Sequence, residues 1–159
     1  MRMLRVLCGV FAICMATLPA HAGAIDDRAQ ALLAWIGEHT DYDVSGIVPR
    51  ILKKDKEYIQ FLGTRASHKD RRGTNAVTTG NTVYLMSSFV LGEDDHILLH
   101  ELVHVVQNRR GDLYRCRTIN EGEAYALQDQ FSAETGIGER VDTALLYLLS
   151  FCPNHYGLP

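Results

Sequence analysis

The pattern of hydrophobic and polar positions along the chain predicts helices mixed with short strands. Apolar residues recur at helical spacing in three segments, 26–39, 54–62 and 139–151. Runs of β-favouring residues occupy 47–52, 75–78 and 82–86. Pro49 has no amide proton to donate, so the first strand is expected at a sheet edge, and Gly80-Asn81 predicts a hairpin between the other two. We therefore predict an α+β domain with a small sheet.

A further segment, Asp94 to Gly111, has the pattern of a buried helix. Its apolar side chains lie on almost every face: Ile97, Leu98, Leu99, Leu102, Val103, Val105 and Val106. Acidic residues at its start and arginines at its end complement the helix dipole, and Gly111 is well placed to end the helix. Polar side chains inside such a helix need a reason.

Three polar residues inside this helix, His100, Glu101 and His104, form the pattern H-E-x-x-H. Residues four apart on a helix differ by a rise of about 6 Å and a rotation of only about 40°, so both histidines can bind one metal ion. Glu101 is rotated by about 100° and can act as general base without binding the metal. This predicts Zn2+ as cofactor, His100 and His104 as ligands, and Glu101 as the catalytic residue. Including His96 would spread three ligands over about 12 Å, so we expect His96 beside the site or facing solvent.

The surroundings of this motif resemble a known family. An H-E-x-x-H helix, preceded by a small sheet and followed by a glutamate-bearing helix, resembles the gluzincin zinc metallopeptidases of the thermolysin-like clan. Residues 100–107 are also similar to the HELxHVxQ sequence of small bacterial domains of unknown function that are predicted to be minimal peptidases. The resemblance is specific over residues 83–130 and implies a minimal zincin-like domain acting on peptide or protein substrates. Arg110 stands where metzincins carry a third histidine, which excludes that arrangement.

Gluzincins take their third metal ligand from a glutamate on a later helix, and this chain offers two. The family register favours Glu121, which has Asn120 before it and Ala124 three residues after it. Glu123 is the alternative, since the two lie at similar angles to the inward face of a helix.

The sequence does not decide two further features of a gluzincin site. The family usually has an acidic residue or Asn where Tyr125 stands, and this residue orients a metal-binding histidine. Asp129 or Gln128 are possible replacements. A peptidase also needs a group that stabilises the oxyanion, and four residues are candidates: His155, Tyr156, Tyr147 and Tyr84.

The strand at 82–86 comes directly before the metal helix. We expect it at an edge of the sheet, where its unpaired backbone groups can align an extended peptide substrate. The segment 139–151 is expected to close the domain as a helix whose core face carries Val141, Leu145, Leu148 and Leu149.

Residues 1–22 have the pattern of a secretory signal peptide. Arg2 and Arg5 precede an apolar core at 6–18, and Ala20-His21-Ala22 gives the A-x-A cleavage pattern. The apolar core is short for a membrane span, which needs about 20 residues. We predict a secreted or periplasmic protein with no stable membrane anchor after cleavage, and a single metallopeptidase-like domain at 23–159.

Charge and cysteine content agree with export. Removal of the signal takes the formal net charge from −3 to −5, which argues against a nucleic-acid surface. Cys116 and Cys152 remain as an even pair in an oxidising compartment, and a disulfide between them would contribute about 3 to 4 kcal/mol if unstrained. The alternative, that they are zinc ligands, lacks any C-x-x-C spacing.

The sequence thus predicts an exported zinc-dependent metallopeptidase. Two alternatives remain: a non-catalytic zinc-binding or interaction module, and a metal-dependent amidase that acts on cell-wall material. Neither the substrate nor the oligomeric state follows from the sequence.

Overall fold

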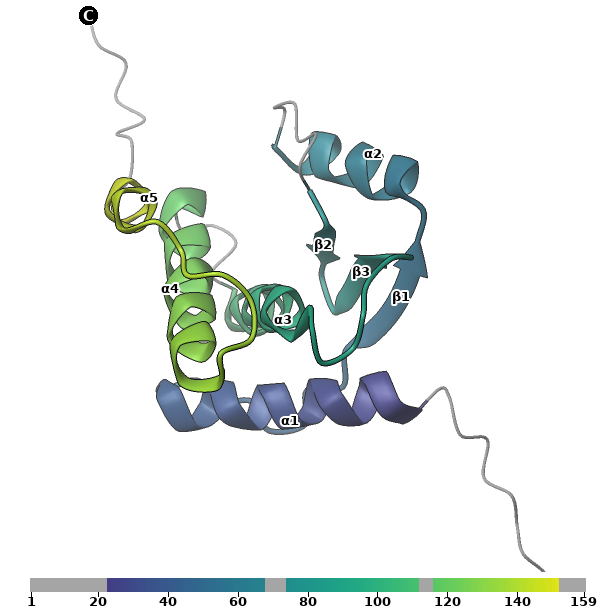
Figure 1. The fold of residues 1–159 in the computed structure, drawn as a ribbon, viewed down its shortest axis with the longest axis horizontal. Helices are drawn as coiled ribbons and strands as arrows, with labels where there is room; N and C mark the ends of the chain where they lie inside the picture. The colour runs from purple at the N-terminus through teal and green to yellow at the C-terminus, as the bar shows by residue number, and fades with distance from the viewer. Residues whose placement is uncertain (1–22, 68–73, 112–115, 152–159) are drawn as a thin grey trace, which may run out of the picture.

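The computed structural model describes residues 23–67, 74–111 and 116–151. These residues form five helices and three strands, so the predicted α+β class is confirmed (Figure 1). The elements are, in chain order, α1 (Gly23–His39), β1 (Arg50–Lys54), α2 (Lys56–Ser67), β2 (Ala76–Thr79), β3 (Thr82–Met86), α3 (Asp95–Arg110), α4 (Arg117–Thr135) and α5 (Thr143–Leu149). The predicted signal peptide at 1–22 lies outside the described residues.

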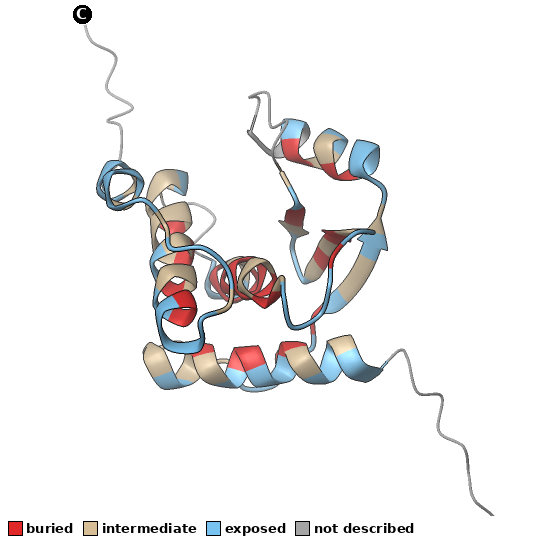
Figure 2. Ribbon diagram, viewed as in Figure 1, coloured by how far each residue is buried: buried red, intermediate tan, exposed pale blue. Residues whose placement is uncertain are grey.

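Helix α3 lies at the centre of the fold. Figure 1 shows it nearly end-on, with α4 on one side, the sheet on the other and α1 crossing beneath, and α3 contacts all three. The face that α1 turns to this core carries Ala29, Leu32, Leu33 and Ile36, all buried. Figure 2 shows buried residues over most of α3. A helix with apolar residues on almost every face must be covered on several sides.

The ends of α3 are fixed as its sequence predicts. Gly111 caps the C-terminus with a φ of 78°, a left-handed conformation that favours glycine. Asp95 in the first turn is fully buried, and its carboxylate accepts hydrogen bonds from Arg28 Nε of α1 at 2.6 Å and from the Gly92 amide at 2.9 Å. The buried charge is therefore paired, and the pair ties α1 to the start of α3.

The sheet has the strand order β1-β3-β2. β2 and β3 form the predicted antiparallel hairpin, with Val77 opposite Tyr84. β1 pairs with β3 in parallel, which requires the crossover that α2 provides. β1 lies at an edge, as expected from Pro49.

The expectation that the strand at 82–86 is an edge strand is wrong. β3 is the central strand, and its backbone groups are paired with β1 on one side and β2 on the other. It therefore has no unpaired edge to offer to a peptide. The predicted hairpin is confirmed, but β1, which precedes α2, pairs with the side of β3 that a hairpin alone would leave open.

The two faces of β3 meet different helices. Val83 and Leu85 are buried in the core with α3, so side-chain alternation turns Tyr84 to the opposite face. There its ring lies 5.7 Å from the ring of Tyr58 in α2.

Helix α5 is shorter and more exposed than the sequence predicts. It begins at Thr143, because the Asp142 carboxylate caps it by accepting a hydrogen bond from the Ala144 amide at 2.8 Å. None of its residues is buried, and Leu148 is 67% exposed, so the predicted core face is wrong. α5 packs on α4 so closely that a Cβ atom added at Gly122 would lie 2.9 Å from the carbonyl oxygen of Leu149.

No helix in the described part of the chain combines the length and the apolar character needed to cross a membrane.

Candidate metal centre

Helices α3 and α4 bring His100, His104 and Glu121 together. The Nε2 atoms of the two histidines lie 3.2 Å apart, and each lies 3.6 Å from Oε2 of Glu121. Ligand atoms that are about 2.0–2.2 Å from one tetrahedral zinc ion are separated by about 3.3–3.6 Å. Two imidazole nitrogens and one carboxylate oxygen are also a ligand set that zinc accepts. These three residues could therefore hold a metal ion.

No other group of three potential metal ligands comes together within the described ranges. Cys116 is disulfide-bonded and is therefore not a zinc ligand, while its expected partner Cys152 lies outside the described residues. His96 does not join the metal group. Its ring packs against Gly138 so closely that a Cβ atom added to Gly138 would lie 2.4 Å from His96 Cγ.

Glu123, the alternative third ligand, has a different place in the structure. Its Oε2 accepts hydrogen bonds from the Tyr42 hydroxyl at 2.6 Å and from Gln107 Nε2 at 3.1 Å. Gln107 Nε2 also donates to the Asn120 carbonyl oxygen at 3.0 Å. Both partners of Nε2 are acceptors, which fixes the orientation of the Gln107 amide.

This chain of hydrogen bonds orients His104. Oε1 of Gln107 lies 2.8 Å from His104 Nδ1 and can only accept, so Nδ1 carries a proton and donates it. Nε2 of His104 is then the nitrogen turned to the metal group. Gln107, Glu123 and Tyr42 thus hold this ligand in place from three different parts of the chain.

His100 is held differently. Its ring lies 4.4 Å from the ring of Tyr125 at an interplanar angle of 63°, and its buried Nδ1 atom has no hydrogen-bond partner among the described residues. Asp129, suggested as a replacement, instead accepts hydrogen bonds from Arg140 at 2.7 Å. Tyr125 therefore meets His100 through an edge contact between their rings.

The charges of the metal group depend on one another. Burial disfavours the charged carboxylate of Glu121, but the imidazoles of His100 and His104 outweigh burial and hold the pKa of Glu121 far below its ordinary 4.5. Burial also lowers the pKa of His104, yet Glu121 and Glu101 outweigh it, so this pKa is raised above the ordinary 6.5. Glu121 is therefore ionised at neutral pH, and a proton on His104 competes with a metal ion.

We expect zinc to stabilise the protein more strongly at about pH 8 than at about pH 6, because metal binding must displace the proton from His104. Without metal, the raised pKa of His104 gives stability that is present below the ordinary 6.5 and lost as the pH rises through the raised value. Thermal unfolding with and without zinc at both pH values measures this difference. An equal or larger zinc-dependent rise in Tm at the lower pH contradicts it.

Glu101 lies beside the metal group without joining it. The residue is 7% exposed, and it is near enough for its charge to raise the pKa of His104. Its Oε2 accepts a hydrogen bond of 2.6 Å from the hydroxyl of Thr78 in β2. The helical rotation between His100 and Glu101 thus separates a candidate metal ligand from a carboxylate outside the metal group.

A family model described as a domain of unknown function, DUF6647, matches residues 21–157. The chain belongs to this family. Searches of curated proteins and of solved structures found no match. The family match therefore places the chain in a family but gives it no activity. Inference about function rests on the residues of the metal centre.

Two of the four candidates for oxyanion stabilisation, Tyr84 and Tyr147, lie in the described part of the chain. Tyr84 lies on the sheet face turned away from α3, and Tyr147 is 66% exposed with its ring 4.9 Å from Phe151. His155 and Tyr156 lie outside the described residues. Arg117 was not expected near the site, but its Nη2 atom lies 3.7 Å from Oε1 of Glu121 and places a cation beside the metal group.

The contacts of Thr78 with Glu101 and of Gln107 with His104 were not predicted from the sequence. The sequence does contain a signal for Gln107. It lies three residues after His104, on the same side of a helix whose other buried residues are mostly apolar. Thr78 left none, because its contact with Glu101 depends on how β2 packs on α3.

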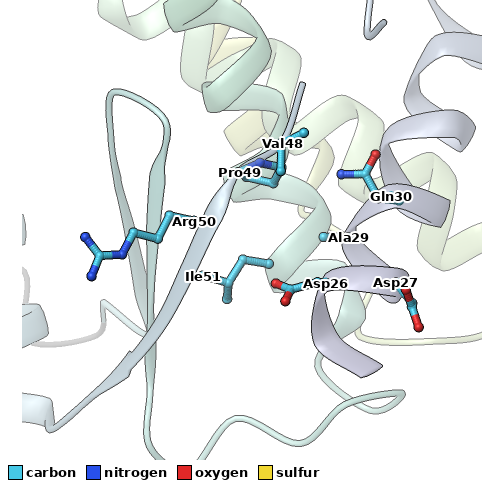
Figure 3. A pocket seen from close by; sticks show the side chains of 8 residues that line it. All are labelled: Asp26, Asp27, Ala29, Gln30, Val48, Pro49, Arg50 and Ile51. Carbon is cyan, nitrogen blue, oxygen red and sulfur yellow. The ribbon is translucent and has the colours of Figure 1, made fainter. Parts of the chain in front are cut away.

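A pocket of about 490 Å³ lies elsewhere, between the start of α1 and the start of β1 (Figure 3). Figure 3 shows the guanidinium of Arg50 pointing away from Asp26 and Asp27, so the charged side chains do not converge on a ligand. The lining includes no residue of the metal centre.

Proposed function

We propose that this protein is an exported zinc-dependent peptidase. One observation carries the proposal: His100, His104 and Glu121 converge at tetrahedral separations, while Glu101 is buried beside them and outside the ligand group. Two imidazoles, a carboxylate and an adjacent second carboxylate are the side chains that metal-assisted hydrolysis requires.

A zinc ion held by these residues would lower the pKa of a water molecule and polarise the carbonyl group of a substrate. Glu101 would accept the proton of the attacking water and then give it to the leaving amine. Gln107 would keep Nε2 of His104 turned to the site throughout, through its hydrogen bond of 2.8 Å to Nδ1.

The edge strand beside Glu101 is β2, which we propose as the strand that aligns the substrate. β2 is the end strand of the sheet order β1-β3-β2 and pairs only with β3 within the described residues. It also carries Thr78, which contacts Glu101 directly. A peptide pairing with the outer edge of β2 would extend the sheet next to the catalytic carboxylate.

Two features support export. The family match begins at residue 21, close to the predicted cleavage site. Cys116 is disulfide-bonded, as is common in oxidising compartments.

The test is hydrolysis by the purified, zinc-loaded protein, assayed on a mixture of unstructured peptides and, separately, on cell-wall fragments. We expect peptide cleavage that a chelator abolishes and added zinc restores. Zinc-dependent cleavage of wall fragments alone would favour the amidase. Stoichiometric zinc without turnover on either substrate would contradict both enzymatic functions.

The second candidate, a non-catalytic zinc-binding module, is favoured by one observation. Nδ1 of His100 is buried without a hydrogen-bond partner in the described structure, because Tyr125 contributes its ring at this place. A missing hydrogen bond to a ligand reduces activity or metal affinity by about 10 to 100-fold. A site with this weakness is better suited to holding a metal than to rapid turnover.

A further inference from the structure

The hydroxyl of Thr78 makes a short hydrogen bond to Glu101. Oγ1 lies 2.6 Å from Glu101 Oε2 and 3.0 Å from the backbone oxygen of the same residue. A length of about 2.5–2.7 Å is typical of a hydroxyl that donates to a charged carboxylate. The hydroxyl has one proton, and the shorter contact to the carboxylate is the stronger of the two.

This contact joins two elements that are rigid at this position. Thr78 and Ala76 lie on the same face of β2, and Ala76 is buried in the core with α3. Glu101 lies in the middle of α3, where the neighbouring Leu102 is fully buried. Oε2 of Glu101 is therefore held toward the sheet by a donor whose own position is fixed by packing.

The position of Glu101 needs such a restraint. A carboxylate is a good zinc ligand, and a site with three protein ligands has a fourth position that catalysis must leave for water. Glu101 follows the ligand His100 directly, and both residues are buried in α3. Its carboxylate is nevertheless not part of the metal group.

We propose that Thr78 is a positioning residue that keeps the Glu101 carboxylate out of the metal's ligand set. With Oε2 held at β2, Glu101 serves as a base and does not become a fourth ligand. The inference rests on the proposed function of the metal centre, but its first test needs only metal binding.

Removing the Thr78 hydroxyl then has an unusual expected result: tighter zinc binding together with slower catalysis. In Thr78→Val, which keeps the shape of the side chain, we expect the Kd for Zn2+ to fall on the order of tenfold, because a released carboxylate can become a further zinc ligand. We expect Thr78→Ser, which keeps a donor, to stay near wild type. Competition with a chromophoric chelator measures these values, and Thr64→Val, at an exposed hydroxyl on α2, is the matched control.

A double-mutant cycle separates this role from a structural one. If Glu101 becomes the extra ligand, the gain in affinity disappears when Thr78→Val is combined with Glu101→Gln. With Co2+ as probe, the visible absorption should change in Thr78→Val but not in the double variant, because the spectrum reports the ligands. A general loss of packing would weaken zinc binding in both backgrounds.

Unchanged or weaker zinc binding by Thr78→Val, in protein that melts as wild type does without metal, overturns the proposal. If Thr78→Val does not fold, Thr78→Ala takes its place, and the same outcomes apply. Tighter zinc binding that persists in the double variant also overturns it.

On peptides, we expect the kcat of Thr78→Val to fall about 10 to 100-fold with little change in KM. If no variant, wild type included, cleaves peptides, the proposed peptidase function fails while the zinc measurements still decide the role of Thr78.

Discussion

Glu121→Gln is expected to weaken zinc binding by more than about 100-fold, because groups that only neighbour metal ligands already affect affinity by 10 to 100-fold. Glu121 is the only contribution of α4 to the metal group, and it supplies the negative charge that offsets the cation. An amide of the same shape keeps the packing but removes the charge. Zinc content by elemental analysis and affinity by chelator competition measure the effect.

Glu123→Gln is the matched control, two residues away on the same helix. Glu123 accepts hydrogen bonds from Tyr42 and Gln107 and does not belong to the metal group. We expect stoichiometric zinc, with affinity reduced at most about tenfold through the weaker orientation of His104. Loss of zinc in this variant and its retention in Glu121→Gln would show that the three-ligand assignment is wrong.

Glu101→Gln is expected to keep zinc and to abolish peptide hydrolysis. General-base catalysis typically contributes about 10² to 10⁴-fold, and an amide cannot accept the proton. The three ligands are untouched, and the amide can still accept the hydrogen bond from Thr78. Turnover and zinc content must be measured on the same sample, so that loss of activity is not confused with loss of metal.

Substantial turnover in zinc-loaded Glu101→Gln would contradict the role of Glu101 as base. The matched control is Glu93→Gln, at an exposed glutamate just before α3 that has no part in the metal group. We expect it to retain both zinc and turnover.

Local signals predicted much of this fold. The C-cap and bounds of α3, the hairpin of β2 and β3, and the edge position of β1 each depend on a few neighbouring residues. Helical spacing likewise placed His100 and His104 on one side of α3 with Glu101 beside them.

What sequence did not predict depends on how separate elements pack. The parallel pairing of β1 with β3 depends on the path of α2. Because of this pairing, β3, which was expected to be an edge strand that aligns the substrate, is the central strand. The Thr78 contact joins β2 to α3 across 23 residues, and the Tyr42 contact joins the segment after α1 to α4 across 81. The exposure of α5 follows from its position on the outer side of α4, which its apolar sequence does not reveal.

The docking of α1 depends on contacts between residues that are far apart in the sequence. Its ties to the rest of the domain span long stretches of sequence: 67 residues from Arg28 to Asp95 and 99 residues from Trp35 to Glu134. Contacts of such separation form slowly, because the intervening loop must close first. A chain that emerges with its N-terminus first cannot complete this domain until residue 134 is available. We therefore expect any metal ion to be acquired late in folding.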